Sequence, residues 1–90
     1  MLNESQKGKF TARAKEEAKK LLQELNISAL TDDSIGALQN ELVARVSGLV
    51  SADEDGKAID KELLEIYDLL TDIVLDNEEN LNFLNELFLK

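Results

Sequence analysis

Three acidic residues near the middle of the chain have the spacing of a calcium-binding loop. When residues 51–62 are aligned with the twelve positions of a helix–loop–helix calcium loop, Asp53 and Asp55 take the third and fifth positions. Gly56 then takes the sixth position and Glu62 the twelfth. In such a loop short carboxylates surround the cation, the glycine permits a sharp turn, and the final Glu binds with both oxygens. The spacing therefore predicts a candidate calcium site at Asp53, Asp55 and Glu62.

The same segment is also compatible with a purely structural turn between two helices. Its first position is Ser51 instead of Asp, and its eighth, which favours a branched apolar residue, is Ala58. In this interpretation Gly56 occupies a left-handed backbone conformation and Asp60 caps the following helix. Both interpretations remain open at the level of the sequence.

Groups that could catalyse a reaction are scarce. The chain contains no Cys or His, which excludes Cys and His nucleophiles, the commonest general base and zinc sites of the usual kind. Asp68 and Asp72 lie one helical turn apart, but nothing in the sequence marks this carboxylate pair as desolvated. No glycine-rich phosphate loop is present. We therefore expect a protein that is not an enzyme and that has no cofactor.

The C-terminal segment is rich in large apolar residues, with six of them in residues 81–89. A short helix that is apolar on most sides either inserts deeply into the core or docks one face on a partner. The second alternative includes a homodimer formed through this helix. The candidate partner-binding residues are Leu81, Phe83, Leu84, Leu87 and Phe88.

Acidic residues are concentrated in the later part of the chain. The 90 residues carry a net charge of −9, yet residues 1–30 hold six cations and four anions, whereas residues 31–90 hold four cations and fifteen anions. This balance argues against direct binding to a nucleic-acid backbone, which needs clustered cations. The anions are either solvated helix faces that keep the protein soluble, or an acidic surface for a basic partner such as a DNA-binding protein.

Helical periodicity of apolar residues runs through almost the whole chain. The pattern predicts helices over about 5–25, 31–50 and 60–75, followed by a short helix up to residue 89. Thr31, Asp60 and Asp76 are the expected N-caps, the last in a capping box with Glu79. Ninety residues form one domain, and no strand pattern is present. The expected fold is an all-α, single-domain antiparallel four-helix bundle spanning residues 1–90.

No apolar stretch reaches the roughly 18–20 residues that span a bilayer. Residues 1–10 are polar and lack the apolar centre of a signal peptide. We therefore expect a protein that does not span a membrane and that is located in the cytoplasm.

Three helical segments resemble the immunity proteins of class IIa bacteriocins, of the enterocin A immunity type. Residues 42–47, Leu-Val-Ala-Arg-Val-Ser, resemble a family helix of the form Leu-Val-x-Arg-Leu-Ser. Residues 61–70, Lys-Glu-Leu-Leu-Glu-Ile-Tyr-Asp-Leu-Leu, resemble a family helix with a Glu-x-x-Glu-Leu-Tyr-like pattern. Residues 18–25 are similar to the opening helix of the family.

The resemblance implies an antiparallel four-helix bundle in the cytoplasm of a bacterium that produces a bacteriocin. Proteins of this family protect the producer from its own pore-forming peptide, acting with the membrane sugar-transporter receptor and without catalysis. In the family the C-terminal half sets specificity, which here contains Phe83, Leu87 and Phe88. The expected partner is therefore a protein.

Overall fold

Five helices make up the secondary structure of this chain, and there are no strands. In chain order they are α1 (Glu4–Lys9), α2 (Ala12–Glu24), α3 (Asp32–Glu54), α4 (Lys61–Asp76) and α5 (Leu81–Leu89). The structure is a computed structural model that describes residues 1–90. The all-α class expected from the sequence is thereby confirmed.

The predicted first helix is wrong in one respect, because it is two helices with a sharp break at Phe10 and Thr11. Thr11 has an extended backbone and its hydroxyl accepts a hydrogen bond from the backbone N–H of Ala14, so it is the N-cap of α2. The break turns Phe10 onto the C-terminal helix, where its ring lies 6.1 Å from that of Phe88 at an angle of 45°. A local cap and a tertiary aromatic contact together outweigh the continuous helical pattern.

Two of the three predicted helix starts are confirmed. The side chain of Thr31 accepts a hydrogen bond from the N–H of Ser34, and Asp60 accepts one from the N–H of Leu63, as N-caps do. Gly56 has a φ of 77° just after α3, the left-handed conformation expected for it. Helix α3 ends at Glu54, about one turn later than predicted.

The third predicted start, at Asp76, is wrong. Asp76 is the last residue of α4, and α5 is capped by Asn80, whose side chain accepts a hydrogen bond from the N–H of Phe83. The Asp76 carboxylate accepts a hydrogen bond from Nε2 of Gln6 at 2.8 Å instead. The carboxylate that the local pattern assigned to a helix cap therefore forms a contact between distant parts of the chain.

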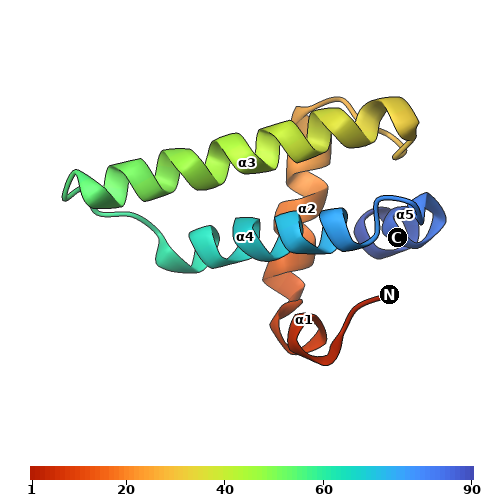
Figure 1. Ribbon diagram of the computed structural model, residues 1–90, viewed down its shortest axis with the longest axis horizontal. Helices are drawn as coiled ribbons and strands as arrows, with labels where there is room; N and C mark the ends of the chain where they lie inside the picture. Colours follow the sequence, from red (N-terminus) through yellow and green to blue (C-terminus); the bar gives the residue numbers. More distant parts are fainter.

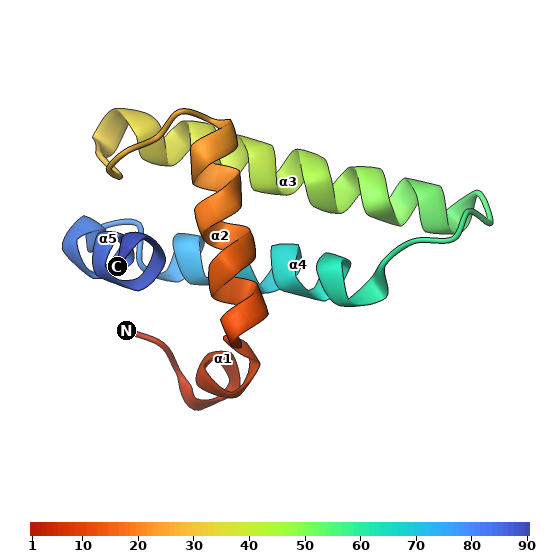
Figure 2. The ribbon, with the colours of Figure 1, turned by 180° about the vertical axis from the view of Figure 1, so that it is seen from behind.

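The helices are arranged around a hairpin of α3 and α4, which run side by side in opposite directions (Figure 1). Helix α2 crosses one face of this hairpin steeply and lies in front of it when the molecule is seen from behind (Figure 2). Helix α1 lies at the N-terminal end of α2 and contacts α4, while α5 lies beyond the C-terminal end of α4 and contacts α2 (Figure 1). The regular antiparallel four-helix bundle is not confirmed, since α3 and α4 alone have that relation.

The core is a cluster of fifteen buried apolar residues. Helix α4 contributes six of them, more than any other helix: Ile66, Tyr67, Leu69, Leu70, Ile73 and Val74. It is the central helix because its apolar stripe is wide enough to contact α3 on one side and α1 and α2 on the other. None of the five helices is long and apolar enough to cross a membrane.

Candidate acidic groove between α2 and α4

A surface groove of about 670 Å³ runs between the start of α2 and the outer side of α4. Ten residues line this acidic groove, four of which are carboxylates from α4: Lys9, Thr11, Ala12, Arg13, Glu62, Glu65, Ile66, Asp68, Leu69 and Asp72. Because α4 begins at the Asp60 cap and continues without interruption, residues three or four apart lie along one side of it. The helix therefore presents its carboxylates to the groove in a row.

Three of the four groove carboxylates are free. Glu65, Asp68 and Asp72 are exposed, and none of them forms an ion pair or a hydrogen bond within the chain. The apolar part of the lining comes from Ile66 and Leu69, which are almost completely buried. The groove thus combines three free carboxylates and one unpaired cation, Lys9, with an apolar floor.

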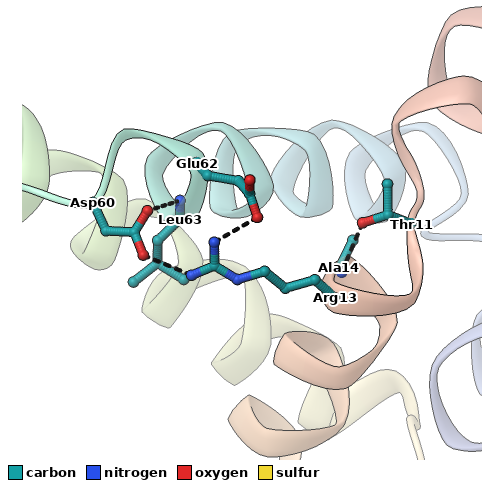
Figure 3. A network of polar contacts seen from close by, with 6 residues as sticks. All are labelled: Thr11, Arg13, Ala14, Asp60, Glu62 and Leu63. Carbon is teal, nitrogen blue, oxygen red and sulfur yellow. Dashed lines mark hydrogen bonds and ion pairs between the residues drawn. The ribbon is translucent and has the colours of Figure 1, made fainter.

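Arg13 connects the two helices at one end of the groove (Figure 3). Its Nη2 lies 2.6 Å from Oδ2 of Asp60, and its Nη1 lies 2.5 Å from Oε1 of Glu62. The other oxygen of Asp60 accepts the N–H of Leu63 at 3.1 Å, so one carboxylate both caps α4 and binds the arginine. These side chains remain 39–62% exposed, which limits the energy of each pair in water.

The same contacts shift the pKa values of this pair. The hydrogen bond from Arg13, and then the hydrogen bond from the N–H of Leu63, hold the pKa of Asp60 below its ordinary value, because both stabilise the ionised carboxylate. Hydrogen bonds to Asp60 and Glu62 raise the pKa of Arg13. Arg13 is therefore a permanent cation, and it is paired with Asp60 and Glu62 of the same chain.

The residues of the candidate calcium loop are not brought together. Asp53 lies in the last turn of α3, Asp55 is the C-cap of that helix, and Glu62 lies in the first turn of α4 bound to Arg13. No group of three acidic side chains in the chain is close enough to hold a metal ion. The geometry matches the structural interpretation, in which this segment is a turn with Gly56 in the left-handed conformation.

The candidate partner-binding residues of the C-terminal helix are used mainly inside the molecule. Leu84 and Phe88 are 0% and 1% exposed, so they belong to the core. Leu81, Phe83 and Leu87 are half-buried and pack against that core. Of the two alternatives for this helix, the arrangement favours insertion over docking on a partner.

Two polar residues that the sequence did not single out join separate elements. The Asn85 side chain accepts the N–H of Leu30 at 2.7 Å and donates to the carbonyl of Leu30 at 3.0 Å, which fixes α5 to the connection before α3. A mid-helix asparagine at helical spacing from the apolar Leu81 and Phe88 was the one signal available for this contact.

Arg45 is the second such residue and lies in a network that joins α2, α3 and α4. Its guanidinium donates to Glu24 at 2.5 Å, to Glu41 at 3.0 Å and to the Tyr67 hydroxyl at 3.0 Å. It also lies 5.5 Å from the centroid of the Tyr67 ring, within the range of a cation–π contact. The only sign of this network in the sequence was that Arg45 is the one cation in a stretch of α3 with few charged residues.

No family model, curated protein or solved structure matches this chain. A row of free carboxylates above apolar carbon atoms suits the ammonium or guanidinium groups of Lys and Arg side chains, with their aliphatic stems on the floor. The one hydroxyl in the lining, that of Thr11, accepts the N–H of Ala14 as a helix cap.

Proposed function

We propose that this protein is a non-enzymatic binding protein whose acidic groove accepts a Lys- or Arg-rich segment of a partner protein. The observation that carries the proposal is the row of three free carboxylates, Glu65, Asp68 and Asp72, beside the buried apolar pair Ile66 and Leu69. A partner of this kind is a DNA-binding protein whose basic surface the protein would neutralise.

Charge favours such a partner at long range as well as in contact. The net charge of −9 attracts a cationic segment during diffusion, and salt weakens that attraction over a distance of about 10 Å at 0.1 M. Within the groove, each charge-assisted hydrogen bond to a free carboxylate adds affinity without first breaking a bond inside the protein. Arg13 already neutralises Glu62, so the free carboxylates are the ones that remain for a partner.

The experiment is a binding titration with a fluorescently labelled lysine-rich peptide, followed by fluorescence anisotropy. The test variant Glu65→Gln/Asp68→Asn/Asp72→Asn removes the free carboxylates while preserving side-chain size. We expect it to bind the peptide at least tenfold more weakly than the unaltered protein, and we expect binding by the unaltered protein to fall steeply with salt.

The matched control is Glu16→Gln/Glu54→Gln/Glu79→Gln. These three glutamates are exposed and unpaired, and their replacement changes the net charge by the same amount. Binding by the control variant should remain close to that of the unaltered protein. Equal losses in the two variants would show an effect of overall charge and would contradict a binding groove.

Immunity to a class IIa bacteriocin is a second proposal, supported by the all-helical fold and by the complementarity between an acidic groove and a cationic peptide. In this role the protein acts in the cytoplasm of the producer as a four-helix-bundle-like protector. Expression in a sensitive strain should raise its survival in the presence of the peptide. Unchanged survival with every class IIa peptide tested would remove this proposal and would leave the groove proposal standing.

A further inference from the structure

The two walls of the acidic groove carry free charges of opposite sign. The α4 wall has the three free carboxylates, whereas the other wall is built from the end of α1 and the first turn of α2. Three side chains of this second wall are polar, and two of them are engaged: Thr11 caps α2, and Arg13 binds Asp60 and Glu62. The third, Lys9, is exposed and forms no ion pair. One free ammonium group therefore belongs to the same groove as the row of free carboxylates.

The backbone of Lys9 is held in place on both sides. Lys9 is the last residue of α1, and Gln6, three residues before it, donates from Nε2 to the Asp76 carboxylate of α4 at 2.8 Å. Phe10, directly after it, has its ring 6.1 Å from that of Phe88. Gln6 is only 6% exposed, so the first of these anchors is buried. The fold therefore fixes the position at which the Lys9 side chain enters the groove.

A free cation on one wall changes which segments fit the groove. A segment that carries only Lys and Arg gains from the carboxylates of α4 but is repelled by Lys9, because like charges brought together cost free energy. A segment that also carries a carboxylate beside its cations can form ion pairs with both walls. Charge complementarity therefore favours a segment of mixed charge over a uniformly basic one.

The walls also favour one conformation of that segment. This chain has no strands, so no sheet edge is available to pair with the backbone of an extended segment. A helix satisfies its own backbone groups and brings only side chains to the groove. From Glu65 to Asp72 the row of carboxylates is about 10.5 Å long at 1.5 Å per residue. Cations at the first, fourth and eighth positions of a helix repeat the spacing of Glu65, Asp68 and Asp72.

We propose that Lys9 is the specificity-determining residue of the acidic groove, and that the groove accepts a partner helix with Lys or Arg along one side and Asp or Glu beside that row. The cations of this helix pair with the free carboxylates of α4, and its carboxylate pairs with Lys9. Lys9 has this role only if the groove binds a basic segment, so the proposal rests on the proposed function and narrows the class of partner.

Two peptides of about twelve residues test the role of Lys9. Both carry lysine at the first, fourth and eighth positions in a background of alanine and serine, and peptides this short are mostly not helical when free. The fifth and seventh positions flank the lysine row on either side at 100° per residue, so one of them can meet Lys9 whichever way the helix runs. They hold glutamate in the acidic-flank peptide and glutamine in the neutral-flank peptide.

Fluorescence anisotropy at about 0.05 M salt gives the Kd of each peptide for the unaltered full chain and for Lys9→Gln. The quantity compared is the Kd of the acidic-flank peptide divided by that of the neutral-flank peptide. We expect Lys9→Gln to raise this ratio by about threefold or more, because it removes the cation that pairs with the flanking glutamate in an exposed site. Carbon-13 chemical shifts of the bound acidic-flank peptide should be those of a helix, and shifts of an extended chain would overturn the helical occupant.

The matched control is Lys7→Gln. Lys7 lies in the same last turn of α1 and is exposed and unpaired, but it does not line the groove. Its replacement changes the net charge by the same amount and should leave the ratio close to that of the unaltered protein. Equal increases in Lys7→Gln and Lys9→Gln would show an effect of net charge and would overturn the role of Lys9.

The remaining outcomes separate the role of Lys9 from the groove itself. Both peptides should bind less tightly to Glu65→Gln/Asp68→Asn/Asp72→Asn than to the unaltered protein. If they do, and the ratio is the same in Lys9→Gln and in the unaltered protein, the binding groove stands and the specificity role of Lys9 is overturned. If the triple variant binds both peptides as tightly as the unaltered protein, the groove proposal falls and the role of Lys9 falls with it.

Discussion

The two arginines of the chain bind carboxylates on neighbouring helices, whereas the lysines hardly do so. Arg13 joins α2 to Asp60 and Glu62, and Arg45 joins α3 to Glu24 on α2 and to Glu41. Among the lysines only Lys90 forms an ion pair, with a residue four positions away. A planar guanidinium can donate to two carboxylates at once, which an ammonium group on a flexible stem does less well.

Replacement of Arg45 by Met should lower the free energy of unfolding by about 1–3 kcal/mol, because charged hydrogen bonds to two carboxylates and the Tyr67 hydroxyl are lost. Arg45→Lys keeps the positive charge but lacks the planar guanidinium group. Its free energy of unfolding should therefore lie between those of Arg45→Met and the unaltered protein. Urea denaturation of the three proteins measures the difference. Identical midpoints for Arg45→Met and the unaltered protein would mean that the network does not stabilise the fold.

The Asp60 carboxyl should titrate below its ordinary pKa, and Arg13→Gln should raise that pKa toward the ordinary value. Because the folded-state pKa lies below the unfolded one, ionised Asp60 stabilises the fold above about pH 4, and this contribution disappears as the pH falls through the folded value. Carbon-13 NMR of the carboxyl group in both proteins is the measurement. The same midpoint in both would show that Arg13 does not act on Asp60.

At the scale of the elements, local signals predicted the helices and their starts where no distant residue interfered. Thr31 and Asp60 cap α3 and α4 as their side chains and positions predict. The break at Phe10 was missed because the apolar spacing continues across it, whereas the structure has a local cap at Thr11 and a contact of Phe10 with the distant Phe88 ring. Helix α5 starts later than predicted, at the Asn80 cap, and the Asp76 carboxylate binds Gln6, which is distant in sequence.

The acidic groove could be predicted only in part. The acidic character of the second half and the carboxylates Asp68 and Asp72 were visible in the sequence, as was their helical spacing. Glu65 was not singled out, and the wall formed by Thr11 and Arg13 depends on where α2 crosses α4. The position of that crossing is set by the packing of the core, and local sequence patterns carry no information about it.

Helix α5 is a structural element of the core, and its deepest residue should show this. Phe88→Ala removes a ring that is 1% exposed and contacts Phe10, so we expect a loss of about 3–5 kcal/mol in the free energy of unfolding. Phe83→Ala, at a half-buried position of the same helix, should cost less. Thermal and urea unfolding compare the two. If Phe83→Ala cost more, α5 would not be inserted as described.

At the scale of the whole molecule, the net charge of −9 is distributed unevenly over the surface. Helix α4 concentrates free carboxylates along the groove, while the outer side of α3 is almost uncharged. The free negative charge is therefore concentrated along α4, and the outer side of α3 is left neutral. Salt should therefore weaken the proposed association of a basic partner with the groove.

The most direct test of the binding groove is NMR mapping of the nitrogen-15-labelled protein during titration with a lysine-rich peptide at low salt. We expect shifts of backbone amide signals over residues 9–13 and 62–72, at the two walls of the groove, and no shifts around Val43 and Val50. Shifts spread over all acidic segments, including residues 32–33 and 53–55, would contradict a defined binding groove and would leave only non-specific attraction between opposite charges.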